Sequence, residues 1–189
     1  MNTNDEILDL LIKRDLLLQR VGNGLSKDVA TQYIKMIDEA INSLGKVDVS
    51  LINMNKIIKE INSNIGLDYS KVEDSLSEVA ITEAGYIPTA INGIVAVDIM
   101  NKTLPDSLVN KIVRNSYLSD GSTISEAFEK LDVKVQEIFQ NQIRLGVLNG
   151  STTQEIIKNI KPFITDLTDN KVRTLVKTAL STVVNNTRL

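Results

Sequence analysis

Carboxylate side chains are the first residues in this chain whose types could support chemistry. Asp5 with Asp9, and Glu73 with Glu78, could be drawn as pairs sharing general acid and base roles. Surface helices carry such carboxylates routinely, so we predict no catalytic role for them. The loop at residues 119–122 has the Ser-Asp-Gly-Ser pattern of a calcium-loop fragment, but the other ligands and the closing Glu are missing at the required spacing. We expect it to precede and cap a helix.

The composition removes most catalytic machinery, because the chain contains no His and no Cys. Disulfides, tetrahedral zinc sites, thiol nucleophiles and the usual general base are therefore excluded, and a metal site would need oxygen ligands. The sequence also lacks GxxxxGK[ST], GxGxxG, GxSxG and HExxH motifs. We therefore expect a protein that is not an enzyme and that uses no cofactor and no metal.

Length and charge indicate a folded globular protein that does not bind nucleic acid through its bulk charge. The 189 residues are 42% hydrophobic and 24% charged, which is the balance of a globular chain. A net charge of -3 argues against bulk electrostatic binding of nucleic acid, although a local basic stripe could still act. The chain has no apolar run near the roughly 20 residues of a membrane helix, and its acidic start is wrong for a signal peptide. We expect a soluble, intracellular protein without membrane contact.

Helix signals predict an all-α fold, with an N-terminal helical hairpin or arm over residues 1–66 and a C-terminal helical bundle over residues 67–189, or one continuous domain. Thr3 and Glu6 have capping-box spacing, and the Gly22–Gly24 link predicts an antiparallel hairpin. The helices expected in the N-terminal part are residues 3–21, 26–44 and 50–65.

The first predicted helix is apolar over more of its circumference than one packing partner needs. Either it is sandwiched within its own domain, or it is an arm that binds a partner or another copy of the chain. Under the second alternative, the docking residues would be Leu10, Leu11, Leu17 and Leu18.

The C-terminal part should contain several shorter helices. Their expected ranges are residues 70–85, 106–113, 122 to 146 or 150, 152–161, and 168 onward. Thr152 and Glu155 form a second capping box, and Pro162 should end the helix that follows it. The run Ile94–Met100 is compatible with a strand or a helix, and we favour a helix because no other clear strand is available for pairing.

The last predicted helix carries a basic stripe of Arg173, Lys177 and Arg188. At 100° per residue these side chains fall within about 60° of one another on the flank of the apolar face. The stripe could contact DNA phosphates or an acidic partner, or it could be a solvated helix flank. Three charges release few counterions, so a DNA contact would be weak and sensitive to salt.

The C-terminal third resembles the tailed-phage minor head proteins, the head morphogenesis family typified by the phage Mu F-like proteins. In that family a Gly-[ST] loop precedes a long helix, and a turn with the pattern G-x-x-x-G-x-[ST]-x-x-E-I follows the helix. The region closes with another helix, which carries spaced Arg or Lys, Thr, Asn and Arg residues. The matching stretches are residues 121–124, 146–156, 172–178 and 185–188. Val172 replaces a small residue of the family motif, and the sequence ends directly after the motif, as in a short member or a fragment.

The resemblance implies a structural minor head protein that acts in head morphogenesis. It would dock at the portal vertex, on the portal protein or other head proteins. It could also contact packaged DNA and assist DNA packaging or ejection. The implied location is the virion, with the host cytoplasm during assembly, and an oligomer would be compatible with this role. The alternative is a bacterial helical adaptor or regulatory protein-binding module without catalytic activity.

Overall fold

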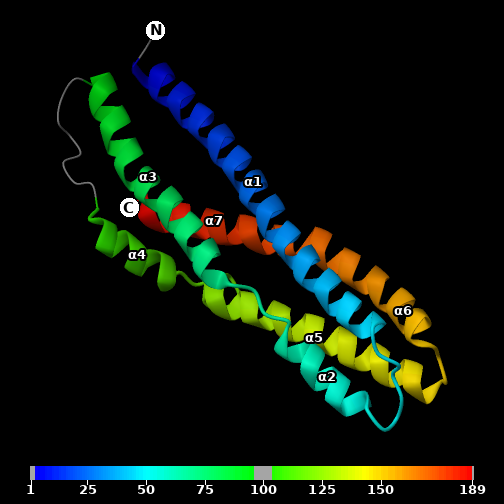
Figure 1. Cartoon of the computed structure of the whole chain (residues 1–189). Helices are drawn as coiled ribbons and strands as arrows, with labels where there is room; N and C mark the ends of the chain where they lie inside the picture. The colour runs from blue at the N-terminus through cyan, green and yellow to red at the C-terminus, as the bar shows by residue number, and fades with distance from the viewer. Residues whose placement is uncertain (1–2, 96–103, 189) are drawn as a thin grey trace. The chain divides into compact units, whose positions relative to one another are not determined.

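The fold of the chain is all-α, as predicted. The computed structural model describes residues 3–95 and 104–188, and Figure 1 shows that helices account for most of them. Outside the helices, Tyr117 and Thr123 form an isolated antiparallel bridge. The helices in chain order are α1 (Thr3–Gly45), α2 (Met54–Ser63), α3 (Tyr69–Val95), α4 (Asp106–Arg114), α5 (Ile124–Leu148), α6 (Thr153–Asp166), the π-helix η1 (Leu167–Val172) and α7 (Arg173–Thr187).

Contacts divide the chain into two compact units. The first unit contains Met1–Ser26, Tyr69–Ser125 and Val176–Leu189, and the second contains Lys27–Asp68 and Glu126–Leu175. Both units therefore combine segments from before and after residue 66, where the sequence analysis placed a boundary. Each unit has its own buried apolar side chains, which include Leu76, Val109 and Val183 in the first and Tyr33, Phe139 and Ile160 in the second.

The predicted hairpin at Gly22–Gly24 is wrong, because α1 continues through these glycines for 43 residues. Gly22 does not have a positive φ angle. It is buried, and a Cβ atom at its position would lie 2.8 Å from Cδ2 of Leu180. The Ser26 hydroxyl also donates a hydrogen bond of 2.5 Å to the Gly22 carbonyl. Gly22 therefore lets α7 approach α1 closely, and it does not terminate the helix.

The predicted end of the α3 helix near Gly85 is also wrong, since α3 continues past Pro88 to Val95. A single proline removes one backbone hydrogen bond, and tertiary packing can outweigh that loss. The turn before Pro88 is held by such packing, because Ala84 is buried and Tyr86 lies under the Arg14 guanidinium at 4.2 Å from the ring centroid. Of the ambiguous run, residues 94 and 95 are helical and residues 96–100 lie outside the described residues.

Pro162 does not end its helix as predicted, because α6 extends to Asp166 and continues through η1 into α7. The carbonyl left without an amide donor is that of Lys158, which is an exposed residue, so water can satisfy it. Beyond it, Ile164 and Thr168 are buried, and the Thr168 hydroxyl donates a hydrogen bond of 2.7 Å to the Ile164 carbonyl. Burial of this segment keeps the backbone helical where the sequence predicted a break.

The corner between α5 and α6 has the local structure that the sequence predicted. Gly150 has a φ angle of 68°, and the Gly150 and Ser151 amides donate to the carbonyls of Val147 and Gly146, at 3.2 and 2.8 Å. This pattern is a Schellman motif. It leads into α6, whose capping box of Thr152 and Glu155 is confirmed: the Thr152 amide donates to the Glu155 carboxylate at 2.7 Å.

Gly146 is the close-contact residue of this corner. A Cβ atom at its position would overlap Cγ1 of Ile156 and would lie 2.7 Å from Cδ1 of the same side chain. Ile156 is completely buried, so it has little room to move away. The first glycine of the G-x-x-x-G pattern thus serves helix packing, and the second supplies a positive φ angle.

We predict that Gly146→Ala destabilises the protein by about 1–2 kcal/mol, because overpacking outweighs the gain of roughly 1 kcal/mol in helix propensity. The matched control is Gly24→Ala in α1, where an added Cβ meets nothing within 4 Å. That variant should gain about 0.5–1 kcal/mol. Urea denaturation followed by circular dichroism measures both values. Equal stabilisation in the two variants would contradict the packing role of Gly146.

A second prediction concerns the α6 capping box at low pH. The backbone amide of Thr152, and then its hydroxyl, hold the pKa of the Glu155 carboxyl below its ordinary value. A lowered folded-state pKa means that the capping contribution is present at neutral pH and is lost as the pH falls through that pKa. Carboxyl NMR titration should show the low value, and Thr152→Ala should raise it part of the way. Thr165→Ala, at an exposed position of the same helix, should leave it unchanged.

Candidate functional site

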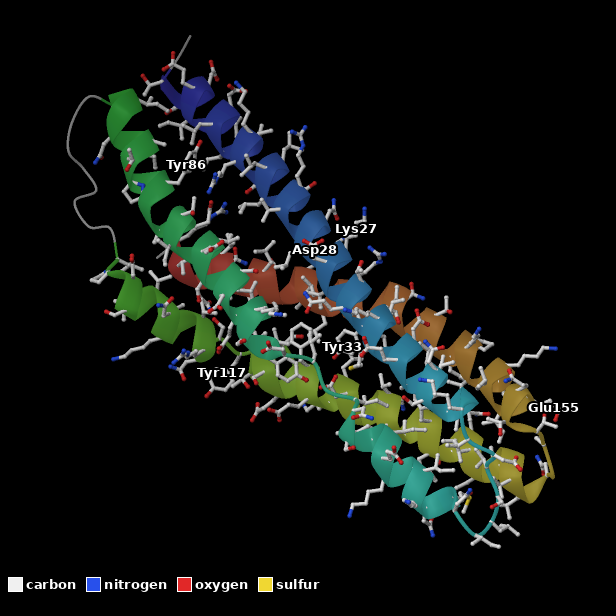
Figure 2. The ribbon with its side chains drawn as sticks, in the orientation of Figure 1. Lys27, Asp28, Tyr33, Tyr86, Tyr117 and Glu155 are labelled. Atoms are coloured by element: carbon white, nitrogen blue, oxygen red, sulfur yellow. The ribbon has the colours of Figure 1, made fainter. Side chains whose placement is uncertain are left out.

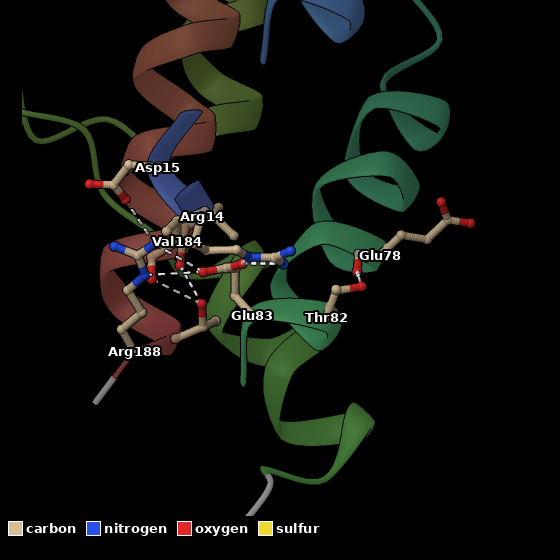
Figure 3. A network of polar contacts seen from close by, with 9 residues as sticks. Arg14, Asp15, Glu78, Thr82, Glu83, Val184 and Arg188 are labelled. Carbon is tan, nitrogen blue, oxygen red and sulfur yellow. Dashed lines mark hydrogen bonds and ion pairs between the residues drawn. The ribbon is translucent and has the colours of Figure 1, made fainter. Parts of the chain in front are cut away.

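A buried carboxylate holds three helices of the first unit together. Glu83 of α3 has no exposed surface, and its two oxygens are bound by different arginines (Figure 3). Arg14 of α1 binds Oε1 through both Nε and Nη2. Arg188, which follows α7, binds Oε2 through Nε and Nη2, each at 3.1 Å, and its Nη2 also lies 3.3 Å from Asp15. Glu83 therefore links three distant segments of the chain.

The arrangement is electrostatically balanced. Two guanidinium groups face two carboxylates, so the cluster of Arg14, Arg188, Glu83 and Asp15 has no net formal charge. The Arg14 guanidinium is also stacked on Tyr86, labelled in Figure 2, in a cation–π contact. A carboxylate with both oxygens bound by arginines and without solvent access is poorly placed to act as a general base. The geometry favours a role in positioning helices.

The structure places the three residues of the predicted basic stripe in different settings. Arg188 uses its charge within the protein, in the cluster around Glu83. Lys177 is exposed and belongs to the first unit, whereas Arg173 is half-buried and belongs to the second. Lys177 and Arg188 both line one groove. Helical spacing predicts which residues share a flank, but it contains no information on ion pairs such as those of Arg188. DNA contact by these residues stays a prediction.

The groove that contains Lys177 and Arg188 lies between α1 and α7 and has a volume of about 530 Å³. Leu18, Leu180 and Val184 contribute apolar surface. The other lining residues are Asp15, Gln19, Gly22, Asn23, Lys177, Ser181, Asn185 and Arg188. The positive charges of Lys177 and Arg188 are accompanied by the carboxylate of Asp15, so the groove is not a simple anion-binding site.

The N-terminal half of α1 exposes one residue predicted for docking, Leu17, and three apolar residues that were not predicted. Leu18 is buried in the core, Leu10 and Leu11 are half-buried, and Leu17 is 46% exposed. The apolar side chains that face solvent most strongly in this half of α1 are Leu8, Ile12 and Leu16, with exposed fractions of 58%, 52% and 51%. Their spacing of four residues places them along one face of the helix. The sequence carried this signal, but the leucine-rich surroundings obscured it.

One carboxylate of each acid pair considered in the sequence has a cationic partner. Asp9 binds Lys13 one turn later at 2.7 Å, and this hydrogen bond raises the pKa of the Lys13 ammonium. Glu73 lies 3.7 Å from Arg114. In the loop before α5, the Asp120 carboxylate accepts hydrogen bonds from the amide and the hydroxyl of Ser122, at 3.0 and 2.6 Å. That loop thus leads into α5 at Ile124, as expected of a loop preceding a helix.

Within residues 3–95 and 104–188, no group of three or more Asp or Glu side chains is arranged to hold a metal ion. No helix in that same part of the chain combines the length and the apolar character needed to cross a membrane.

The second unit has a buried polar cluster of its own. The Tyr33 hydroxyl, labelled in Figure 2, donates a hydrogen bond of 2.7 Å to Asp132 of α5. The other carboxylate oxygen of Asp132 accepts from the Leu67 amide at 3.1 Å. Nε2 of Gln136 donates to the carbonyls of Asn62 and Ile65. These contacts fix the connection after α2 against α5, and they indicate a structural role.

The connection between α1 and α2 presents two exposed large apolar residues of the second unit. Ile52 is 99% exposed and Leu51 is 67% exposed. The connection is nevertheless well held, because the Thr153 hydroxyl lies within hydrogen-bond distance of the Val47 carbonyl and the Val49 amide, at 3.2 and 3.3 Å. We call residues 51 and 52 the apolar tip. Contiguous apolar surface that is exposed to water is a feature of protein contact sites.

Comparison of the chain with protein-family models, curated proteins and solved structures finds no match.

We predict that Glu83→Gln destabilises the protein by about 3 kcal/mol, since it leaves the buried Arg14 without its counter-charge. The matched control is Glu73→Gln, which removes one carboxylate of a solvent-exposed pair and should cost less than about 1 kcal/mol. Urea denaturation at neutral pH measures both losses. Similar small losses in the two variants would mean that the Glu83 cluster does not hold the helices together.

Proposed function

We propose that the chain is a structural minor head protein of a tailed phage, which acts in head morphogenesis by docking on the portal protein or another head protein at the portal vertex. The observation that carries this proposal is the α5–α6 corner, where a G-x-x-x-G-x-[ST]-x-x-E-I pattern like that of the family is followed at a similar distance by a closing helix. The resemblance speaks for fold, and the function follows from it by analogy.

The geometry of the corner supports the analogy because each pattern residue has a separate physical task. Gly146 permits contact with Ile156, Gly150 adopts a positive φ angle, and Thr152 and Glu155 cap α6. Where the family motif has a small residue, this chain has Val172, and the Val172 side chain is completely buried in the protein core.

A docking role requires a surface that is exposed in the isolated chain, and the apolar tip provides one. Leu51 and Ile52 stand next to a loop that is fixed by the hydrogen bonds of Thr153. Preordering of the loop reduces the entropy lost on binding. We propose that the tip contacts the portal or another head protein.

The basic stripe should contribute less to DNA binding than its three charges suggest. Arg188 is already ion-paired with Glu83 and Asp15, so its charge is largely neutralised before any phosphate approaches. Lys177 retains an exposed position. A contact dominated by one lysine would release few counterions and would add little affinity. In the proposed role, contacts with head proteins therefore contribute more to binding than contacts with DNA.

The second candidate function is a bacterial helical adaptor that binds a protein partner and has no role in a virion. The exposed apolar tip supports this alternative equally well, because it requires a partner but not a phage head. Gene position separates the two candidates. Portal and terminase genes beside this gene would favour the head protein, and their absence would count against it.

We predict that the chain is found by mass spectrometry in purified phage particles, and that Ile52→Asp lowers its amount there at least about tenfold by placing a charge in the contact. Val133→Asp on α5 is the matched control, since Val133 is 51% exposed and lies away from the tip in sequence. Circular dichroism of both purified variants should match the unchanged protein. Absence of the unchanged chain from particles would refute the phage role, whereas equal incorporation of both variants would refute only the docking surface.

A further inference from the structure

The exposed face of the N-terminal half of α1 carries an apolar stripe, which we define as Leu8, Ile12 and Leu16. At 100° per residue the three side chains fall within about 80° of one another. The buried Arg14 lies about 160° around the helix from Ile12, and the buried Leu18 about 120° from it. Arg14 binds Glu83 on that side. The stripe is therefore a second apolar face, separate from the one that builds the core.

Charged residues follow the stripe along one flank in a defined order. Asp5 and Asp9 come first, and Lys13 and Arg20 come later. These four residues fall within about 80° of one another at 100° per residue. All four reach solvent: Asp5, Lys13 and Arg20 are exposed, and the Asp9 side chain is 46% exposed. The flank thus changes from negative to positive along the helix.

This order makes the flank complementary to itself when two copies run in opposite directions. A two-fold axis at Ile12 would place Leu8 of each copy against Leu16 of the other. In an antiparallel pair, the same flanks of the two helices face each other. Asp5 would then lie near Arg20 of the second copy. The Asp9–Lys13 ion pair of each helix would lie beside the same pair of the other helix in reversed order.

A parallel pair lacks this complementarity. In that arrangement the charged flank would face the opposite flank of the second α1, where Asp15 lies. Asp15 is already paired with Arg188, and α1 itself contributes no cation to this flank within the described residues. The charge pattern therefore favours a second copy of this chain as the partner, and it favours an antiparallel over a parallel orientation of the two α1 helices.

We propose that the stripe is a self-association surface on which the α1 helix of a second copy of this chain packs in antiparallel orientation, centred on Ile12. The contact covers only about three helical turns per copy, so the dimer should be weak and should dissociate on dilution. Pairing would remove six large apolar side chains from water. It uses a surface other than the apolar tip, and it does not depend on the proposed role in phage heads.

Sedimentation velocity over a dilution series tests the association. The unchanged chain should shift from dimer to monomer as its concentration falls below the order of 100 µM. Ile12→Glu places two like charges at the axis and should weaken the dimer by at least about tenfold. Leu108→Glu on α4 is the matched control, because Leu108 is 43% exposed in the same unit but lies outside the stripe. Its sedimentation should equal that of the unchanged chain.

Single cysteines test the direction of pairing, and the absence of native Cys makes them unambiguous. A mixture of Leu8→Cys and Leu16→Cys chains should form a disulfide-linked dimer of the two different chains under mild oxidation. Leu8→Cys alone should not crosslink, because its two thiols would lie about 12 Å apart along the antiparallel helices. These variants keep the face uncharged and do not rely on the folding of Ile12→Glu.

Either of two results would overturn the proposal. One is a chain that stays monomeric at concentrations well above 100 µM, roughly the limit of a weak specific contact. The other is preferential crosslinking of Leu8→Cys with itself, which would show a parallel pair. Dimerisation that is equally strong after Ile12→Glu, with an unchanged circular dichroism spectrum, would likewise place the interface elsewhere.

Discussion

The buried carboxylate of Glu83 is the contact on which the first unit depends. A charge without solvent access is tolerated only when opposite charges and hydrogen-bond donors replace the lost water. Arg14 and Arg188 do so from two different helical segments, so both must be in place for Glu83 to be satisfied. Hydrophobic contacts between helices allow sliding, whereas this pairing requires one arrangement. The polar cluster therefore specifies how α1, α3 and the end of α7 meet, and the surrounding apolar side chains add stability to that arrangement.

Glycine and proline positions show how tertiary contacts can reverse a local signal. Gly22 and Gly146 both lie inside helices, and at each of them a neighbouring side chain occupies the space that a Cβ would need. Gly150 has the same residue type but a positive φ angle, and it ends α5. Pro88 and Pro162 lie within helices whose later turns contain buried or half-buried residues. Whether such a residue interrupts a helix is decided by what packs against the turns on either side of it.

The all-α fold, the Thr152 capping box and most of the buried helix faces were predictable, because each depends on spacing within a single helix. The helix ends at Gly22, Gly85 and Pro162 were not, since contacts distant in sequence decide them. The Glu83 cluster left a weaker signal: Arg14 follows the apolar spacing of Leu11 and Leu18, and Glu83 follows that of Leu76 and Ala80. A charged residue at an apolar position indicates a buried ion pair, but one sequence does not identify its partner.

The α5–α6 corner also has a consequence for the order in which the chain folds. Its hydrogen bonds and its Gly146–Ile156 contact all lie within residues 145–156, so only a short loop must close to form them. The contacts of Glu83 with Arg14 and Arg188 join residues separated by 69 and 105 positions in the sequence. Closing such long loops is slow, and contacts of this kind tend to form late. We infer that the corner acts as an early folding nucleus, and that the Glu83 cluster governs chiefly how fast the finished structure unfolds.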